Sequence, residues 1–203
     1  MHRSIFTPGV LLSVSLSILI LLFGGFGASI EPILEFNRSK IIDGEYWRLF
    51  TGNLVHYGFA HLAMNIAAFL IIGFSLLRDV SLKVYVPLFV SCAMAVGIGT
   101  LLWNPELVFY RGLSGVIHGL IVAGLLLNSF RNPWLSYLFV GLVFAKIFHE
   151  HQAGFQENQL QTLIPVPVAV DSHWYGALAG LIYMGLLMAL QKIKKILKLY
   201  QNI

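Results

Sequence analysis

Long apolar runs separated by short polar connections constrain this chain more than any other feature. A helix needs about 20 mostly apolar residues to cross the hydrocarbon core of a bilayer. Six stretches approach that length, and they span residues 10–26, 59–77, 84–103, 113–128, 133–148 and 174–190. Charged residues make up 11% of the chain, whereas soluble proteins carry about 25%. The pattern predicts an all-α membrane protein, in which residues 1–203 form a single domain with six transmembrane helices.

The first apolar run has an alternative interpretation as a signal peptide, because Gly25 and Gly27 offer small residues near a cleavage point. Its apolar core is longer than that of a typical signal peptide, and the basic segment before it is thin. We therefore expect a retained membrane helix.

Basic residues are unevenly distributed among the connections, and this predicts the orientation. Loops rich in Lys and Arg remain in the cytoplasm. A cytoplasmic N-terminus places eight basic residues inside and four outside, and seven acidic residues, Glu150 among them, then fall in outer connections. Both termini are therefore predicted to be cytoplasmic. The inner residues are Arg3, Arg78, Lys83, Arg131, Lys192, Lys194, Lys195 and Lys198, and the outer ones are Arg38, Lys40, Arg48 and Arg111.

The net charge of +4 does not indicate nucleic-acid binding, because the tail lysines directly follow an apolar run. That is the arrangement of a segment lying against anionic lipid. Cys92 is the one cysteine and lies within an apolar run, so the sequence has neither an intramolecular disulfide nor zinc-ligand spacing. We expect no metal and no cofactor.

Polar side chains open the second, fourth and sixth apolar runs. His61 and Asn65 open the second, Ser114 the fourth and His173 the sixth. These three runs enter from the outer side in the predicted topology, so their first turns lie at one depth. Polar groups inside a membrane are costly and mark functional sites by default.

The residue types indicate nucleophilic catalysis. An imidazole can take the proton of a serine hydroxyl and so activate it, which makes His173 the expected base for Ser114. Donors for a developing oxyanion would come from Asn65, His61 and the backbone N–H of Ser114. His61 and Asn65 share one helix face because they are four residues apart. No carboxylate is expected within the membrane, so the sequence predicts a Ser–His dyad.

Glycines surround these residues. Gly112 and Gly115 flank the serine and would allow the chain to turn sharply into the fourth helix. Gly176 and Gly180 form a small-residue face on the sixth helix. We expect that face to approach the fourth helix and so bring His173 to Ser114.

Several of these residues also have plain structural interpretations. A serine at a helix start is commonly an N-cap. Asn65 and His61 are also suited to helix packing, although we favour the oxyanion role for both. His149-Glu150-His151 resembles a metal motif, but two histidines at i and i+2 do not share a helix face. We expect that segment to be a solvated loop.

The order and spacing of the motifs resemble those of rhomboid proteases over residues 46–190. The matching pieces are Trp47-Arg48, Thr51, His56, His61-x-x-x-Asn65, Gly112-Leu-Ser114-Gly and His173-x-x-Gly176-x-x-x-Gly180. The resemblance implies an intramembrane serine endopeptidase that cleaves transmembrane proteins in the bacterial inner membrane, near its periplasmic face. It implies nucleophile and base roles for Ser114 and His173 and oxyanion roles for His61 and Asn65. Arg48 and His56 would fix the first outer loop.

One departure narrows the resemblance. Common rhomboids have tyrosine four residues after the nucleophile, whereas this chain has His118. The short six-span form with Gly-Leu-Ser-Gly-Val-Ile-His-Gly is similar to rhombosortase, a branch that implies substrates with C-terminal Gly-Gly sorting tails in Gram-negative bacteria. His118 either stacks on His173 alone or also takes part in proton transfer.

Other functions fit less well. A zinc protease needs HExxH, which is absent. An intramembrane aspartyl protease needs two aspartates within the membrane, whereas Asp79 and Asp171 lie at opposite edges of the predicted membrane. A small transporter would show inverted repeats, which the sequence lacks. The alternatives left open are a rhomboid protease of general specificity and a rhomboid-like protein that binds membrane helices without cutting them.

Overall fold

The computed structural model describes residues 5–152 and 166–200, and it consists mainly of helices. Arg3 and Glu157, which enter the charge distribution above, lie outside the described residues. The elements are α1 (Pro8–Gly25), α2 (Gly27–Leu34), β1 (Phe36–Asn37), α3 (Arg38–Ile42), α4 (Arg48–Thr51), the 3₁₀ helix η1 (Gly52–Leu54), α5 (Gly58–Ser75), α6 (Leu82–Trp103), β2 (Phe109–Tyr110), α7 (Ser114–Leu127), α8 (Pro133–Glu150) and α9 (Asp171–Tyr200).

A helix occupies each of the six predicted ranges, namely α1, α5, α6, α7, α8 and α9. Four described helices are long and apolar enough to cross a membrane: α1, α5, α6 and the part Asp171–Lys194 of α9. Helix α7 is apolar but has 14 residues. Helix α8 has 18 residues, two of which, Lys146 and Glu150, are charged.

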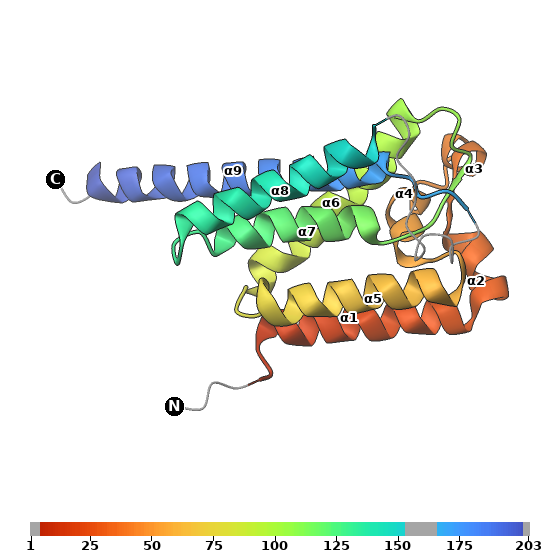
Figure 1. The fold of residues 1–203 in the computed structure, drawn as a ribbon, viewed down its shortest axis with the longest axis horizontal. Coiled ribbons are helices and arrows are strands. Elements are labelled where there is room, and N and C mark those ends of the chain that lie inside the picture. The colour runs from red at the N-terminus through yellow and green to blue at the C-terminus, as the bar shows by residue number, and fades with distance from the viewer. Residues whose placement is uncertain (1–4, 153–165, 201–203) are drawn as a thin grey trace.

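The long helices alternate in direction, so three of them begin at one end of the molecule. Helices α5, α7 and α9 start at the end that carries α2, α3 and α4, whereas α1 begins and α9 finishes at the opposite end (Figure 1). Helix α7 packs on α9, α6 and α8, and α1 packs on α5. The first turns of α5, α7 and α9 therefore lie at the same end, as the sequence predicts.

The main core cluster contains buried apolar side chains from α1, α5, α6, α7 and α9. Phe69, Leu88, Leu113 and Leu120 are fully buried in one cluster. Many large apolar residues lie on outward faces instead, and Ile71 and Trp134 are examples. In a membrane protein such surfaces face lipid, so their exposure carries no hydrophobic penalty.

Helices α7 and α9 approach so closely that glycine is required at their contact. A Cβ at Gly176 would collide with the carbonyl oxygen of Gly115, and a Cβ at Gly180 with that of Gly119. The predicted approach of the sixth helix to the fourth is confirmed. Gly115 has a different role from the predicted one: it lies inside α7 and contributes to this contact, whereas the turn is made by Gly112.

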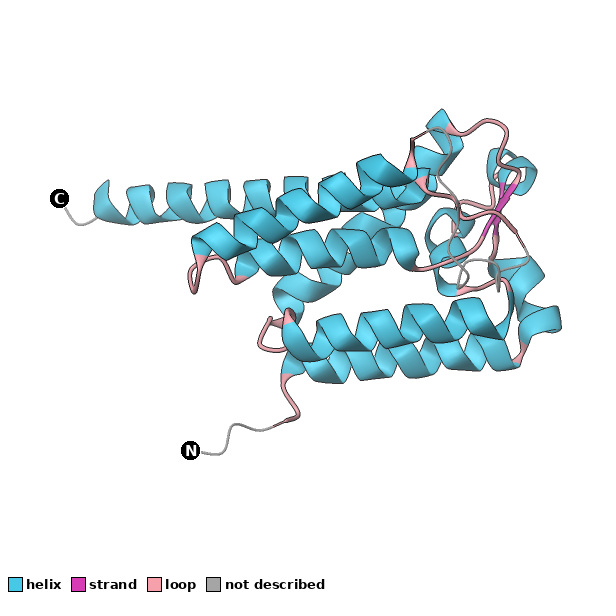
Figure 2. Cartoon of the chain, in the orientation of Figure 1, coloured by secondary structure: helices cyan, strands magenta, loops and turns pink. Residues whose placement is uncertain are grey.

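The expectation of a purely helical fold needs one correction. Strands β1 and β2 pair antiparallel, with Phe36 opposite Tyr110, near α2, α3 and α4 (Figure 2). Both residues are buried, and backbone polar groups in buried segments need hydrogen-bond partners. This small sheet ties the segment after α2 to the loop that leads into α7.

We expect Gly176→Ala to destabilise the protein by about 1–3 kcal/mol, the usual cost of overpacking a tight contact. Gly185→Ala is the matched control in the same helix, because its added Cβ would meet no described atom within 4 Å. Thermal unfolding in detergent can be followed with a thiol-reactive dye, since Cys92 is the one cysteine and is buried. Equal melting temperatures for the two variants would contradict the role of this contact.

Candidate active site

Ser114 is the first residue of α7, and a glycine turn brings the chain to it. Gly112 has φ +140°, a conformation that side chains disfavour. The turn is held by the N–H of Gly112, which donates to the carbonyl of Gly52 at 3.2 Å, and by the hydroxyl of Tyr110, which donates to the carbonyl of Gly112 at 2.7 Å. A Cβ at Gly112 would also lie 2.8 Å from the ring of His61.

His173 lies in the first turn of α9 and faces Ser114. Its Nε2 is 3.1 Å from the hydroxyl oxygen of Ser114, within hydrogen-bond reach, and the ring is buried. Leu113, rather than Ser114, occupies the N-cap position of α7. The N-cap interpretation of Ser114 is therefore wrong, and its hydroxyl meets an imidazole instead.

Glu150 is a site residue that the sequence reasoning missed. Its Oε2 lies 2.9 Å from Nδ1 of His173, and its side chain is 6% exposed. The expectation that no carboxylate would reach the imidazole is wrong, because α8 continues two residues beyond the apolar run and ends at Glu150. The signal was available in the predicted topology, in which the fifth span ends at the same face where the sixth begins.

His118 and Lys146 complete a group of side chains around His173. The rings of His118 and His173 stack with centroids 4.1 Å apart. Nδ1 of His118 is 2.8 Å from the carbonyl oxygen of Ser114, and its Nε2 is 3.0 Å from the Lys146 ammonium. That ammonium also lies 2.8 Å from Oε1 of Glu150.

His61 and Asn65 lie on one face of α5, as their spacing predicts. Both are buried, and they line a cavity of about 270 Å³ together with Ser114, His118 and His173. One N–H of the Asn65 amide donates to the carbonyl of His61 at 3.0 Å. The second N–H of this amide is thus the one that a group in the cavity would use.

Arg48 is buried and connects parts of the segment before α5. Its guanidinium donates to the carboxylate of Glu45 at 2.6 Å and to the carbonyls of Pro32 and Glu35 at 3.0 and 2.9 Å. These contacts join α2 to α4, in agreement with the loop-fixing role that the resemblance implies.

His56 packs edge-on against His61, with ring centroids 5.0 Å apart. Within the described part of the chain, neither ring nitrogen of His56 has a hydrogen-bond partner. Burial, together with the nearby His61, lowers the pKa of His56 to about 3. The ring is therefore neutral at physiological pH and serves as packing behind His61.

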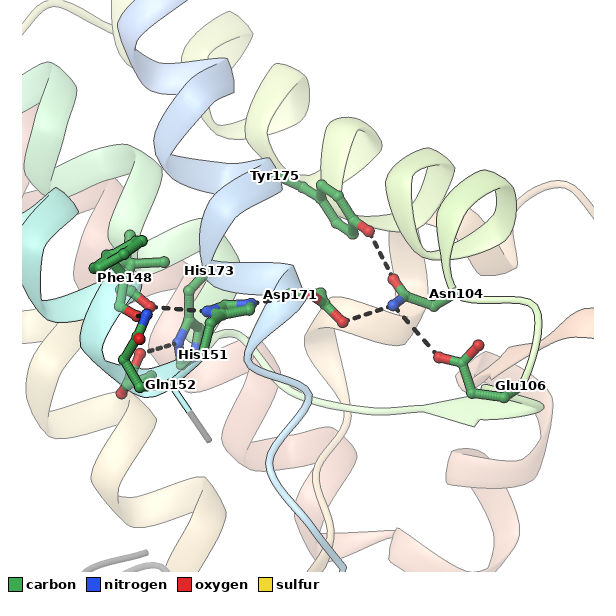
Figure 3. Close-up of polar contacts among 10 residues, drawn as sticks. Asn104, Glu106, Phe148, His151, Gln152, Asp171, His173 and Tyr175 are labelled. Carbon is green, nitrogen blue, oxygen red and sulfur yellow. Dashed lines mark hydrogen bonds and ion pairs between the residues drawn. The ribbon is translucent and has the colours of Figure 1, made fainter. Parts of the chain in front are cut away.

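A second polar network fixes the start of α9. Nε2 of His151 is 2.9 Å from the carboxylate of Asp171, whose other oxygen accepts from the amide of Asn104 at 2.6 Å. Tyr175 donates its hydroxyl to Asn104 at 2.7 Å (Figure 3). His149 and Glu150 are the last residues of α8, so the expectation of a loop is wrong for these two residues. His149 and His151 are exposed as expected, whereas Glu150 is buried.

One group of described residues has metal-ligand spacing, namely His118, Glu150 and His173, whose ligand atoms lie within 4.8 Å of one another. The Lys146 ammonium already contacts two of the three. A fixed positive charge at that point disfavours a metal cation. The chemistry that the arrangement supports is proton transfer between a hydroxyl and an imidazole.

Comparison with known proteins agrees with the motifs. The rhomboid domain family matches residues 43–190 of the chain. A protein of Bacillus subtilis (strain 168), named "Putative rhomboid protease YdcA", is 32% identical over 96 residues, which are 47% of this chain and 48% of that protein. The chain thus matches about half the length of this relative.

A fluorophosphonate should label Ser114, because the probe reacts with serines whose proton is taken by a neighbouring base. Labelling should be absent in Ser114→Ala and at background in His173→Ala. Ser75→Ala is the matched control, since the Ser75 hydroxyl bonds the carbonyl of its own helix at Ile71. Mass spectrometry identifies the labelled residue, and equal labelling of His173→Ala and wild type would contradict the pairing.

Proposed function

The chain belongs to the rhomboid family, and we propose that it is a serine-type intramembrane endopeptidase with Ser114 as nucleophile and His173 as general base. The observation that carries the proposal is the 3.1 Å separation of the Ser114 hydroxyl and Nε2 of His173, at the starts of two apolar helices. A hydroxyl and a base at hydrogen-bond distance are the minimum requirement for nucleophilic acyl transfer.

We propose that this multi-pass membrane protein crosses the bilayer six times, with α7 and α8 as the fourth and fifth spans. Helix α7 has 14 residues, and it is surrounded by α6, α8 and α9. A helix shielded by protein does not need the full length of a lipid-facing span. The excess of basic residues in the inner connections favours cytoplasmic termini. The site would then lie near the periplasmic face of a bacterial inner membrane.

The reaction would follow the usual two steps of acyl transfer. The Ser114 oxygen attacks the scissile carbonyl while Nε2 of His173 takes its proton. His173 then gives this proton to the leaving amine, and an acyl-enzyme remains. A water molecule loses a proton to His173 and attacks the ester, and His173 returns this proton to the Ser114 oxygen as the acid product leaves. The cavity beside Ser114 is where substrate and water would enter.

Charge develops on the carbonyl oxygen of the substrate during both steps. Donors placed near this oxygen lower the barrier, and removal of one such donor costs about 10²–10³-fold in kcat in soluble proteases. We assign this role to Asn65, His61 and the backbone N–H of Ser114. The support is that Asn65, His61 and Ser114 line one cavity.

For the substrate, we propose exported proteins with a C-terminal Gly-Gly sequence followed by an apolar span and a short basic tail. The support is the resemblance to rhombosortase, including His118 at the position that stacks on His173. The physical reason is that a helix must unwind before it can be cut. Gly destabilises a helix by about 1 kcal/mol relative to Ala, so a Gly pair at the outer boundary lowers that cost.

Ser114→Ala should abolish cleavage of a membrane-anchored reporter and leave the protein folded. Loss of a nucleophile or its base reduces kcat on the order of 10⁶-fold in a soluble serine protease. His173→Ala should be as severe, and the double variant no worse than either, because the two groups act as one unit. Turnover above about a tenth of wild type in Ser114→Ala would overturn Ser114 as the nucleophile, whereas no cleavage by the folded wild type would favour a non-catalytic binder of membrane helices.

A Gly-Gly tail fused to a periplasmic reporter should be cut near the glycines in a Ser114-dependent way. Replacement of both glycines by leucine should slow cleavage at least about tenfold, because the leucine helix unwinds less readily. Immunoblots of membrane and soluble fractions give both the cleavage rate and the extent of insertion. Equal rates for the two tails would favour a rhomboid protease of general specificity.

A further inference from the structure

The carboxylate of Glu150 gives the site a component that a Ser–His dyad lacks. We propose that Glu150 is a positioning residue for His173, held in place by Lys146, so that the site operates as a Ser114–His173–Glu150 triad. This inference rests on the proposed function and adds to it a third residue and its anchor.

The hydrogen bonds around His173 allow one arrangement of protons when Glu150 is ionised. The carboxylate only accepts hydrogen bonds, so Nδ1 of His173, 2.9 Å away, carries the proton and donates it. Nε2 is then unprotonated and directs its lone pair at the Ser114 hydroxyl, 3.1 Å away. This is the tautomer that a general base needs, and an acidic partner at Nδ1 fixes both the tautomer and the ring orientation.

The same reasoning assigns the protons of His118. A carbonyl oxygen only accepts, so Nδ1 of His118 donates to the carbonyl of Ser114 at 2.8 Å. The Lys146 ammonium only donates, so Nε2 of His118 accepts from it at 3.0 Å. Both ring nitrogens are occupied, which leaves His118 neutral and outside the path of the transferred proton. It stacks on His173 and anchors Lys146.

Lys146 supplies the charge that Glu150 needs. A carboxylate with 6% exposure is unfavourable without a counterion. The ammonium lies 2.8 Å from Oε1, and its own side chain is 51% exposed, so it keeps access to solvent or lipid headgroups. In the resting site the two charges cancel. When His173 gains a proton and the substrate oxygen becomes negative, the four charges cancel again, which matters where the dielectric constant is low.

A purely structural role for Glu150 is the competing explanation. Helices α8 and α9 have few direct contacts, so the Glu150–His173 and His151–Asp171 pairs also link the two helices. A link of this kind affects stability and the amount of folded protein. It does not set the tautomer of His173 or the pH at which the enzyme gains activity, and those two measurements separate the explanations.

The first experiment does not depend on proteolysis. Protein labelled with ¹⁵N-histidine is examined by NMR in detergent, and His173→Ala identifies the His173 signals. The wild type should show a protonated Nδ1 and an unprotonated Nε2 on His173. Glu150→Gln should raise the population of the Nε2–H tautomer. A wild-type His173 protonated at Nε2, or spectra that Glu150→Gln does not change, would overturn the proposal.

The second experiment measures cleavage per folded molecule. Glu150→Gln should lower kcat by on the order of 10⁴-fold, the loss seen when the acidic member of a soluble triad is replaced, with KM changed less than about twofold. The control is Asp43→Asn, which removes an exposed carboxylate from the segment between α1 and α5. A kcat for Glu150→Gln within about threefold of wild type, while Ser114→Ala is inactive, would overturn the triad and leave the proposed function intact.

The pH dependence of kcat/KM tests the opposite effects that the charges of Glu150 and Lys146 have on protonation of His173. The groups that face His173 are Ser114 and His118 from α7 and Lys146 and Glu150 from α8, with the His151–Asp171 pair beside them. Loss of the Glu150 charge makes protonation of His173 less favourable, so the acid limb of kcat/KM should move to lower pH. Lys146→Met should move it to higher pH, whereas Lys83→Met, at an exposed inner position, should not move it.

A shift of the acid limb in the same direction for Glu150→Gln and Lys146→Met would contradict the charge assignment.

Metal chelation gives the last control, because a metal would replace Lys146 as the counterion. Activity should be unchanged by 1,10-phenanthroline. Loss of activity on chelation, with recovery on addition of zinc, would overturn the proposed role of Lys146.

Discussion

The close contact between α7 and α9 is the constraint on which the rest of the structure depends. Gly115 and Gly119 of one helix face Gly176 and Gly180 of the other without any intervening side chain. A hydrogen bond of 3.1 Å between Ser114 and His173 requires the two helix starts to be adjacent, and backbone contact achieves this at no cost in side-chain entropy. In lipid, where apolar burial gives little driving force between helices, such packing is a main source of association.

Much of the site was predictable because lipid imposes simple rules on a sequence. Apolar length predicts the helices, alternation of direction predicts which ends meet, and polar residues inside apolar runs mark function. Ser114, His173, His61 and Asn65 follow from these rules alone. The same rules explain the failure at Glu150: the helix was judged to end where apolar residues end, but α8 continues because its last turn packs on protein and forms ion pairs.

The short elements between α1 and α5, together with β2, could not be predicted for a different reason. Strands of two residues have no periodicity to detect, and β1 and β2 pair across more than seventy residues of sequence. Arg48 illustrates the problem, since it is buried and bonds backbone carbonyls of α2 and the following residue, and neither its burial nor these partners can be inferred from its spacing. Interactions of this kind are decided by tertiary packing and leave little trace in composition or spacing.

The division of the site between helices has a mechanical consequence. Ser114 and His173 belong to the tightly joined pair α7 and α9, whereas His61 and Asn65 belong to α5, which packs more extensively on α1 than on α7. The proposed nucleophile and the two proposed side-chain oxyanion donors thus belong to different helix pairs. The contact between α5 and α7 is the smaller of the two, so we expect the thickness of the surrounding lipid to act there first. For the proposed protease, this predicts a rate that depends on the physical state of the membrane.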